Sequence, residues 1–197
     1  MKDKRRMHSQ SIDKYFIYVG NAYPHKNLVR LIQAVVFLNN KIKDKVELKI
    51  ASSRNVFTQR LQTEIDSQKA NKFVTLLGDV SDKRLIELYQ NSAGFIFPSL
   101  SEGFGLPGIE AMRAGTLVLA SDISVFKEIY KDNAIYFDPM DFTSIEKVME
   151  NVFEMDKDVR IRRIEKGKDF VKRYSWAKMA KETLEIYESC NSLRPGK

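Results

Sequence analysis

Short apolar runs bounded by turn residues alternate with longer amphipathic stretches along most of the chain. The runs have the length of buried strands, and the stretches between them repeat apolar residues every three or four positions, as one face of a helix does. Regular alternation of strand and helix predicts an α/β fold, a doubly wound parallel sheet covered on both faces. The six predicted strands span residues 15–20, 46–51, 73–78, 94–99, 116–121 and 134–138.

Start and stop signals mark several of the predicted helices. Ser81 precedes a helix over residues 83–90. Pro107 stands where a first helical turn begins, and Gly115 stands where that helix should end. From about Asp141 onward the strand signals vanish, and the pattern is helical to the end of the chain.

The composition is that of one water-soluble domain. Of the 197 residues, 43% are hydrophobic and 30% charged, and a domain usually takes about 100 to 200 residues. We expect a charged N-terminal segment over residues 1–14 and a single domain over residues 15–197, with the helices from about residue 141 included. No apolar run is long enough to cross a bilayer, and no signal-peptide core follows the charged start, so we expect a cytoplasmic protein.

Few residues are available for a metal centre, and the charge favours an anionic partner. One cysteine, Cys190, cannot form an internal disulfide, and the two histidines, His8 and His25, make no ligand cluster. We therefore expect no metal. The net charge of +7 favours nucleic acid, an acidic membrane surface or a phosphorylated small molecule, and does not choose among them. The basic runs at residues 2–6 and 160–168 are interpreted as a solvated tail and a solvated helix face.

Ligands of a doubly wound sheet bind where loops leave the carboxyl ends of the strands. Three such loops stand out, at residues 20–27, 78–82 and 99–112. The third carries several glycines directly before a helix start, where backbone N–H groups and the helix dipole favour a phosphate or a polyhydroxyl ligand. A tight turn that needs glycine only for its path is the competing interpretation.

Charged residues in these loops add candidate chemistry. Glu102 and Glu110 are eight residues apart and can face one crevice, as a glycosidase pair, as acceptors for sugar hydroxyls, or, for Glu110, as a plain helix-dipole partner. Lys26 at a helix start opposes the dipole, which suits a residue that binds phosphate oxygens. His25 is interpreted as a loop residue, and Asn27 as the helix N-cap.

Three segments together carry a family resemblance, namely residues 20–34, 76–122 and 174–188. They resemble the C-terminal, donor-binding half of GT-B glycosyltransferases of family 4 (group 1), which includes bacterial mannosyltransferases and other hexosyltransferases. The most specific element is an E-x7-E motif, from Glu102 to Glu110. The resemblance implies a Rossmann-like doubly wound parallel sheet, one domain of a GT-B glycosyltransferase, with C-terminal helices.

The family pattern also implies roles for individual residues. Glu110 would accept hydrogen bonds from the ribose of a nucleotide-sugar, Glu102 would hold a hydroxyl of the transferred hexose, and Lys26 would neutralise the departing diphosphate. The backbone of the 103–106 loop would line the sugar and diphosphate, and the backbone of residues 78–80 would read the base. The implied donor-binding residues are Gly20, Asn21, Lys26, Gly78, Asp79, Val80, Glu102, Gly103, Phe104, Gly105, Leu106 and Glu110, with Lys26 and Glu102 also catalytic.

One position departs from the family pattern. Many members carry an arginine directly after the first-loop glycine, whereas this chain has Asn21, whose amide cannot offset the charge of a diphosphate. Either Lys26 and the helix dipole suffice, or another cation such as Arg54 or Lys83 approaches.

The resemblance implies retaining, metal-independent transfer of a hexosyl unit from a nucleoside diphosphate sugar to an acceptor hydroxyl in glycan or cell-envelope polysaccharide synthesis. Only one Rossmann-like domain is present, so we expect an N-terminal acceptor domain or partner subunit, and no transfer without it. Peripheral contact with the inner face of the membrane fits this role. The closing helix could join the core or reach the other domain through its apolar residues, which are Trp176, Met179, Leu184, Ile186 and Tyr187.

Two other classes of function compete with a transferase. A noncatalytic nucleotide-sugar-binding module could use the same loops for regulation or assembly. A nucleic-acid-binding domain is disfavoured because the aromatic residues lie in apolar strands and are not interleaved with surface lysine and arginine.

Overall fold

The computed structural model describes residues 14–192, with side chains to residue 190. Six parallel strands form one sheet in the order β3-β2-β1-β4-β5-β6. The strands are β1 (Tyr15–Val19), β2 (Glu47–Ala51), β3 (Val74–Gly78), β4 (Gly94–Phe97), β5 (Val118–Ser121) and β6 (Ala134–Phe137). Every strand predicted from the apolar runs is confirmed, and so is the doubly wound Rossmann-like α/β fold.

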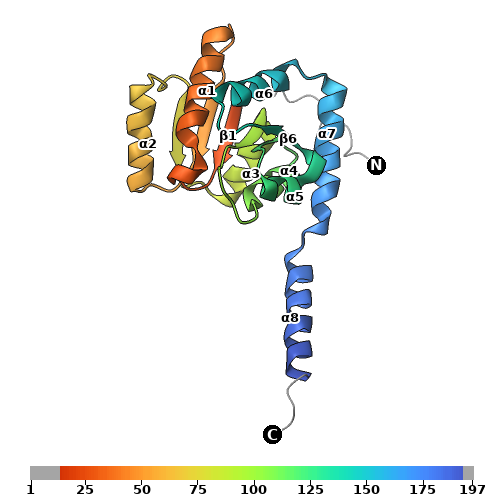
Figure 1. The fold of residues 1–197 in the computed structure, drawn as a ribbon. Coiled ribbons are helices and arrows are strands. Elements are labelled where there is room, and N and C mark those ends of the chain that lie inside the picture. The colour runs from red at the N-terminus through yellow and green to blue at the C-terminus, as the bar shows by residue number, and fades with distance from the viewer. Residues whose placement is uncertain (1–13, 193–197) are drawn as a thin grey trace.

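Helices cover both faces of the sheet (Figure 1). α1 packs against α2 and α6, while α4 packs against α3 and α7. The helices are α1 (Leu28–Lys41), α2 (Val56–Ser67), α3 (Asp82–Asn91), α4 (Leu106–Ala114), α5 (Ser124–Tyr130), α6 (Phe142–Glu154), α7 (Lys157–Phe170) and α8 (Trp176–Ser192). Short 3-10 turns are η1 (Pro24–Lys26), η2 (Lys131–Asn133) and η3 (Val171–Arg173).

The central strands form the core. β1, β4 and β5 carry apolar side chains toward both helical layers and are almost wholly buried, as parallel strands covered on both faces must be. β3 lies at an edge, and its Thr75 is exposed. The contrast explains why the sequence shows continuous apolar runs and no strict alternation in the middle of the sheet.

The predicted helix signals hold in the structure. The Ser81 side chain accepts a hydrogen bond from the N–H of Arg84 at the start of α3. α4 begins at Leu106 with Pro107 in its first turn, and Gly115 ends it with a φ of +90°, a left-handed conformation that favours glycine. Residues 1–13 of the predicted charged segment lie outside the described residues. Lys14 forms an exposed ion pair with Asp44 at 2.7 Å.

The strand order reverses between β1 and β4. β1 leads through α1 to β2 on one side, while β4 leads through α4 to β5 on the other, so the loops after β1 and β4 diverge. A crevice at this point is where doubly wound sheets bind their ligands. The first and third loops singled out from the sequence are these two loops.

Candidate functional site

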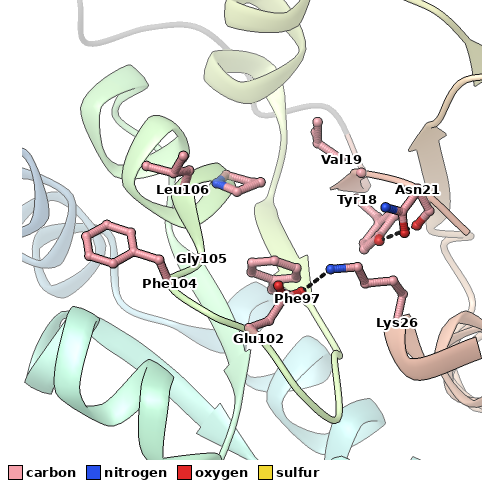
Figure 2. A pocket seen from close by; sticks show the side chains of 11 residues that line it. Tyr18, Val19, Asn21, Lys26, Phe97, Glu102, Phe104, Gly105 and Leu106 are labelled. Atoms are coloured by element: carbon pink, nitrogen blue, oxygen red, sulfur yellow. Dashed lines mark hydrogen bonds and ion pairs between the residues drawn. The ribbon is translucent and has the colours of Figure 1, made fainter. Parts of the chain in front are cut away.

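A cavity of about 360 Å³ lies at the reversal of strand order, at the carboxyl ends of β1 and β4. Figure 2 shows side chains from the two strands and their loops around it. Its lining residues are Tyr18, Val19, Gly20, Asn21, Lys26, Phe97, Glu102, Phe104, Gly105, Leu106 and Pro107. Of the predicted donor-binding residues, Gly20, Asn21, Lys26, Glu102, Phe104, Gly105 and Leu106 are thus brought to one place.

The two predicted catalytic residues contact one another across this cavity. Lys26 Nζ lies 2.5 Å from Glu102 Oε1, and each side chain is only 12% exposed. The Ser99 hydroxyl donates to the same carboxylate oxygen at 2.8 Å, and Lys26 Nζ also lies 5.8 Å from the centre of the Phe97 ring. The lysine and glutamate therefore neutralise each other, and an anionic ligand would compete with Glu102 for Lys26.

The first loop is fixed by short-range contacts. Lys26 ends the η1 turn, in which its N–H donates to the Tyr23 carbonyl at 2.9 Å. The Leu100 N–H donates to the His25 carbonyl at 2.8 Å, which ties the first loop to the third. The Tyr18 hydroxyl donates to the Asn21 carbonyl at 2.7 Å. Burial and, secondarily, Glu102 raise the pKa of this hydroxyl well above its ordinary value, so it remains a donor.

Asn27 precedes α1 as predicted, but the expected capping hydrogen bond is not formed. Its backbone is left-handed with a φ of +59°. The side-chain amide is buried and donates to the Pro98 carbonyl at 3.0 Å and to the Pro139 carbonyl at 2.8 Å. The side-chain oxygen, which would have to accept the capping hydrogen bond, instead accepts one from Arg30 Nη1 at 2.8 Å, so the prediction of a capping side chain was wrong. Asn27 instead joins the loops that follow β1, β4 and β6.

The part of the third loop that contains Gly103, Gly105 and Gly108, called the glycine loop below, leads into α4 at the cavity wall. Gly105 is the residue before the helix, with a φ of +92°. This left-handed value suits glycine, so the loop can turn sharply and bring the helix start to the cavity wall. Phe104, half-exposed, packs edge-on against Tyr174 at 5.7 Å between ring centres and separates this cavity from a second one.

Glu110 lies on the far side of that aromatic pair. It is exposed on α4 and lines a neighbouring cavity of about 470 Å³ together with Arg113, Trp176 and Met179. Leu106 and Phe104 line both cavities. The E-x7-E motif therefore places Glu102 in the lining of the first cavity and Glu110 in the lining of the neighbouring one.

The 78–80 loop lies outside the lining of the first cavity. The Asp79 carboxylate accepts a hydrogen bond from the Ser53 hydroxyl at 2.5 Å, and Gly78 has a φ of +72°. The Arg54 guanidinium lies beside Gly78, with Nε 3.5 Å from where a β-carbon would stand. Of the two cations considered as replacements for the family arginine, Arg54 thus lies at this loop, and Lys83 is exposed on the first turn of α3.

The closing helix α8 stands away from the α/β body (Figure 1). Its large apolar side chains are exposed, Trp176 by 67%. Of the two alternatives left open by the sequence, a core helix is excluded for this structure. An amphipathic helix with a bare apolar face remains.

No helix among residues 14–192 is long and apolar enough to span a bilayer. Within the same range, no three His, Cys, Asp or Glu side chains are grouped as a metal site requires.

A doubly wound sheet with a cation, a carboxylate and a helix start around one cavity defines a binding domain for a polar, anionic ligand. The chain belongs to the family of glycosyl transferases group 1, which matches residues 2–170. It is 33% identical over 168 residues to the O-antigen chain mannosyltransferase RfbU of Salmonella typhimurium. It is 28% identical over 176 residues to the O-antigen chain mannosyltransferase B of Escherichia coli.

These relatives are longer proteins. The two matches cover 85% and 88% of this chain but only 45% of each relative, so the chain spans about half the length of the curated relatives it matches. Solved structures agree in fold. A glycosyltransferase from Rickettsia africae superposes with a TM-score of 0.81 at 21% identity, over 94% of this chain and 50% of that one. A sucrose-phosphate synthase from Thermosynechococcus elongatus superposes with a TM-score of 0.82 at 19% identity, over 94% of this chain and 47% of that one.

Sequence reasoning missed several residues that shape the site. Ser99 and Tyr18 contact the loops that bear Glu102 and Asn21, and Tyr130 lies beneath the glycine loop. Ser99 ends a predicted strand and begins the third loop, a position that could have identified it. Tyr130 carries no such signal, because an aromatic residue at a helix end is ordinary core.

Proposed function

We propose that this chain is the donor-binding half of a retaining glycosyltransferase that transfers a hexosyl unit, mannosyl in the simplest case, from a nucleoside diphosphate sugar to an acceptor hydroxyl. The observation that carries the proposal is the cavity at the β1/β4 reversal, where Lys26, Glu102 and the start of α4 converge. Membership of the group 1 family and the likeness to two O-antigen chain mannosyltransferases support the same function.

In the proposed mechanism, Lys26 and the N–H groups at the start of α4 stabilise negative charge as the diphosphate departs. Groups already aimed at developing charge lower the barrier without reorganisation. Lys26 must exchange its contact with Glu102 for the diphosphate, which frees the carboxylate to accept a hydrogen bond from a hexose hydroxyl. Lys26 Nζ and Glu102 Oε1 are 2.5 Å apart, which supports the proposal that the two side chains change partners together when the donor binds.

The remaining donor contacts follow the family pattern. Glu110 would accept hydrogen bonds from the ribose, across the glycine loop from Glu102. The backbone of Gly78, Asp79 and Val80 would contact the base, with Arg54 close enough to that loop to approach the ligand. Gly103 and Phe104 would lie along the sugar. No metal is part of this proposal.

The acceptor side belongs to a second domain or subunit in this proposal, because one sheet supplies only one wall of a cleft. The exposed apolar face of α8 would lie against that second domain. We place the reaction in cell-envelope polysaccharide synthesis, in the cytoplasm or at the inner face of the membrane, as the O-antigen relatives suggest.

A thermal-shift panel of UDP, GDP, ADP and their sugars tests donor binding, because a ligand at about 100 times its dissociation constant adds roughly 2.7 kcal/mol to stability. Calorimetry of the responding nucleotide, with EDTA present, tests the metal-free site. We expect binding in EDTA. Binding that requires added magnesium or manganese would contradict the proposal. A noncatalytic module would bind the nucleotide-sugar equally well but show no transfer or donor hydrolysis when the second domain is supplied.

A further inference from the structure

Tyr130, the last residue of α5, lies directly beneath the glycine loop. Its side chain is fully buried, and its hydroxyl donates to the Gly105 carbonyl at 2.5 Å. Burial, and then the Glu102 carboxylate, raise the pKa of this hydroxyl well above its ordinary value. The hydroxyl therefore remains protonated and keeps its role as a donor.

The Gly105 carbonyl and the Leu106 N–H belong to one peptide unit. A trans peptide is planar, and its C=O and N–H point in opposite directions. Because the carbonyl is held toward the buried Tyr130, the Leu106 N–H must point away from it. Gly105 and Leu106 both line the cavity, so this N–H is available at the cavity wall.

Tyr130 also explains which glycines the loop requires. A β-carbon on Gly105 would stand 2.2 Å from the Tyr130 hydroxyl oxygen, and one on Gly108 would stand 2.4 Å from it. Both distances are far inside van der Waals contact. Gly103, in the same loop, would meet nothing within 4 Å. Gly105 and Gly108 are therefore required because a side chain at either position would clash with Tyr130, and not only because the loop turns there.

The tyrosine ring is fixed by aromatic packing that continues to the other side of the cavity. It stacks on Phe126 at 5.1 Å and 24°, and Phe126 packs on Phe97 at 4.8 Å. Phe97 lines the cavity, beside Lys26 and Glu102 in Figure 2. Tyr130, Phe126 and Phe97 therefore form one continuous set of packed rings. Its Tyr130 end contacts the glycine loop, and its Phe97 end lies 5.8 Å from the Lys26 ammonium.

We propose that Tyr130 is a positioning residue of the donor site: its hydroxyl fixes the Gly105–Leu106 peptide so that the Leu106 N–H faces the diphosphate of the donor. The inference rests on the proposed function for the identity of the ligand. The orientation of the Gly105–Leu106 peptide does not depend on the proposed function. The two can therefore be tested apart.

The direct test compares Tyr130→Phe with Tyr15→Phe. Tyr15 is an equally buried tyrosine whose hydroxyl donates to the Leu88 carbonyl at 2.7 Å, away from the cavity lining. The residual dipolar coupling of the Leu106 N–H, which reports the direction of that bond, should change without ligand in Tyr130→Phe only. Binding of GDP, UDP and ADP by calorimetry should weaken roughly three- to tenfold in Tyr130→Phe only, the equivalent of one lost hydrogen bond. An unchanged Leu106 N–H direction and unchanged affinity in a folded Tyr130→Phe would overturn the inference.

A second pair of variants covers the case in which Tyr130→Phe does not fold. Gly108→Ala should displace the hydroxyl and weaken nucleotide binding similarly. Gly167→Ala on α7, whose β-carbon would meet Met112 at an ordinary 3.5 Å, should not. Equal affinity of these two alanine variants would refute the positioning role. If the wild-type chain binds none of the three nucleotides, the proposed function fails, and the dipolar coupling of the Leu106 N–H still decides the orientation of the peptide.

Discussion

Removing the charge of Glu102 should strengthen the binding of a free nucleoside diphosphate. Glu102→Gln preserves the shape of the side chain and an oxygen that can accept from Lys26 or Ser99, but no longer holds Lys26 by charge. A hydrogen bond with a charged partner contributes about 1.5–3 kcal/mol, against roughly 0.5–1.5 kcal/mol for a neutral one. The substitution should therefore weaken the interaction between residue 102 and Lys26 by about 1–1.5 kcal/mol.

The released lysine favours the diphosphate. Since about 1.4 kcal/mol corresponds to a tenfold change in affinity, free nucleoside diphosphate should bind roughly five- to tenfold more tightly to Glu102→Gln than to the wild type. The nucleotide-sugar should gain less, because the same substitution weakens the hydrogen bond to the hexose hydroxyl. Calorimetry with the diphosphate and its sugar, for whichever base responds in the thermal-shift panel, measures both effects.

Two variants bracket this result. Glu87→Gln removes one partner of the exposed pair with Arg84 at 3.0 Å and should leave binding unchanged, because exposed pairs contribute little. Lys26→Met removes the cation and should weaken the diphosphate roughly ten- to a hundredfold. If Glu102→Gln weakens the free diphosphate as Lys26→Met does, the competition between Glu102 and the ligand is refuted.

Three further substitutions probe the rest of the site. Glu110→Ala should weaken nucleoside diphosphate and nucleotide-sugar alike by about 1.5–3 kcal/mol, the value of a hydrogen bond to a charged group, and a loss confined to the sugar-bearing ligand would contradict the ribose assignment. Gly103→Ala should leave the thermal midpoint unchanged, because its β-carbon meets nothing within 4 Å, yet weaken the nucleotide-sugar, as calorimetry would show. Asn27→Asp should lower the unfolding free energy in urea by roughly 2–4 kcal/mol, because a carboxylate would face the Pro98 and Pro139 carbonyls; wild-type stability would show that these contacts are dispensable.

The sheet and its helices could be predicted because each is encoded locally. Apolar runs flanked by turn residues indicate the strands. Their regular alternation with helices predicts parallel strands joined by right-handed crossovers. The alternation does not fix the order of strands in the sheet. The rule that ligands bind at the carboxyl ends of the strands was nevertheless enough to single out the two loops that meet at the cavity. Lys26 and Glu102 were identified because unusual residue types occupy those loops.

The contacts within the site depend on tertiary packing and could not be predicted in the same way. The sequence allowed Glu102 and Glu110 to face one crevice, whereas in the structure they line two neighbouring cavities, with the Phe104–Tyr174 contact between these cavities. Asn27 has the residue type of an N-cap, but its side-chain oxygen accepts from Arg30. Its NH2 group donates to two proline carbonyls that only the folded chain brings close. Tyr130 acts from a helix far along the chain from the loop it contacts.

The chain on its own should bind a donor but transfer no sugar. Its described residues form a single sheet, and positioning an acceptor hydroxyl against the donor is worth about 7–11 kcal/mol of barrier. Adding the matching N-terminal half of the enzyme, in trans or fused ahead of residue 1, should restore transfer of labelled hexose to an acceptor extract. Trp176 is the sole tryptophan and is 67% exposed at the start of α8, so its fluorescence should shift to the blue when the second half covers that helix. Robust transfer by the isolated chain would show that it holds its own acceptor site. Restored transfer without a change in Trp176 emission would show that α8 lies outside the contact between the halves.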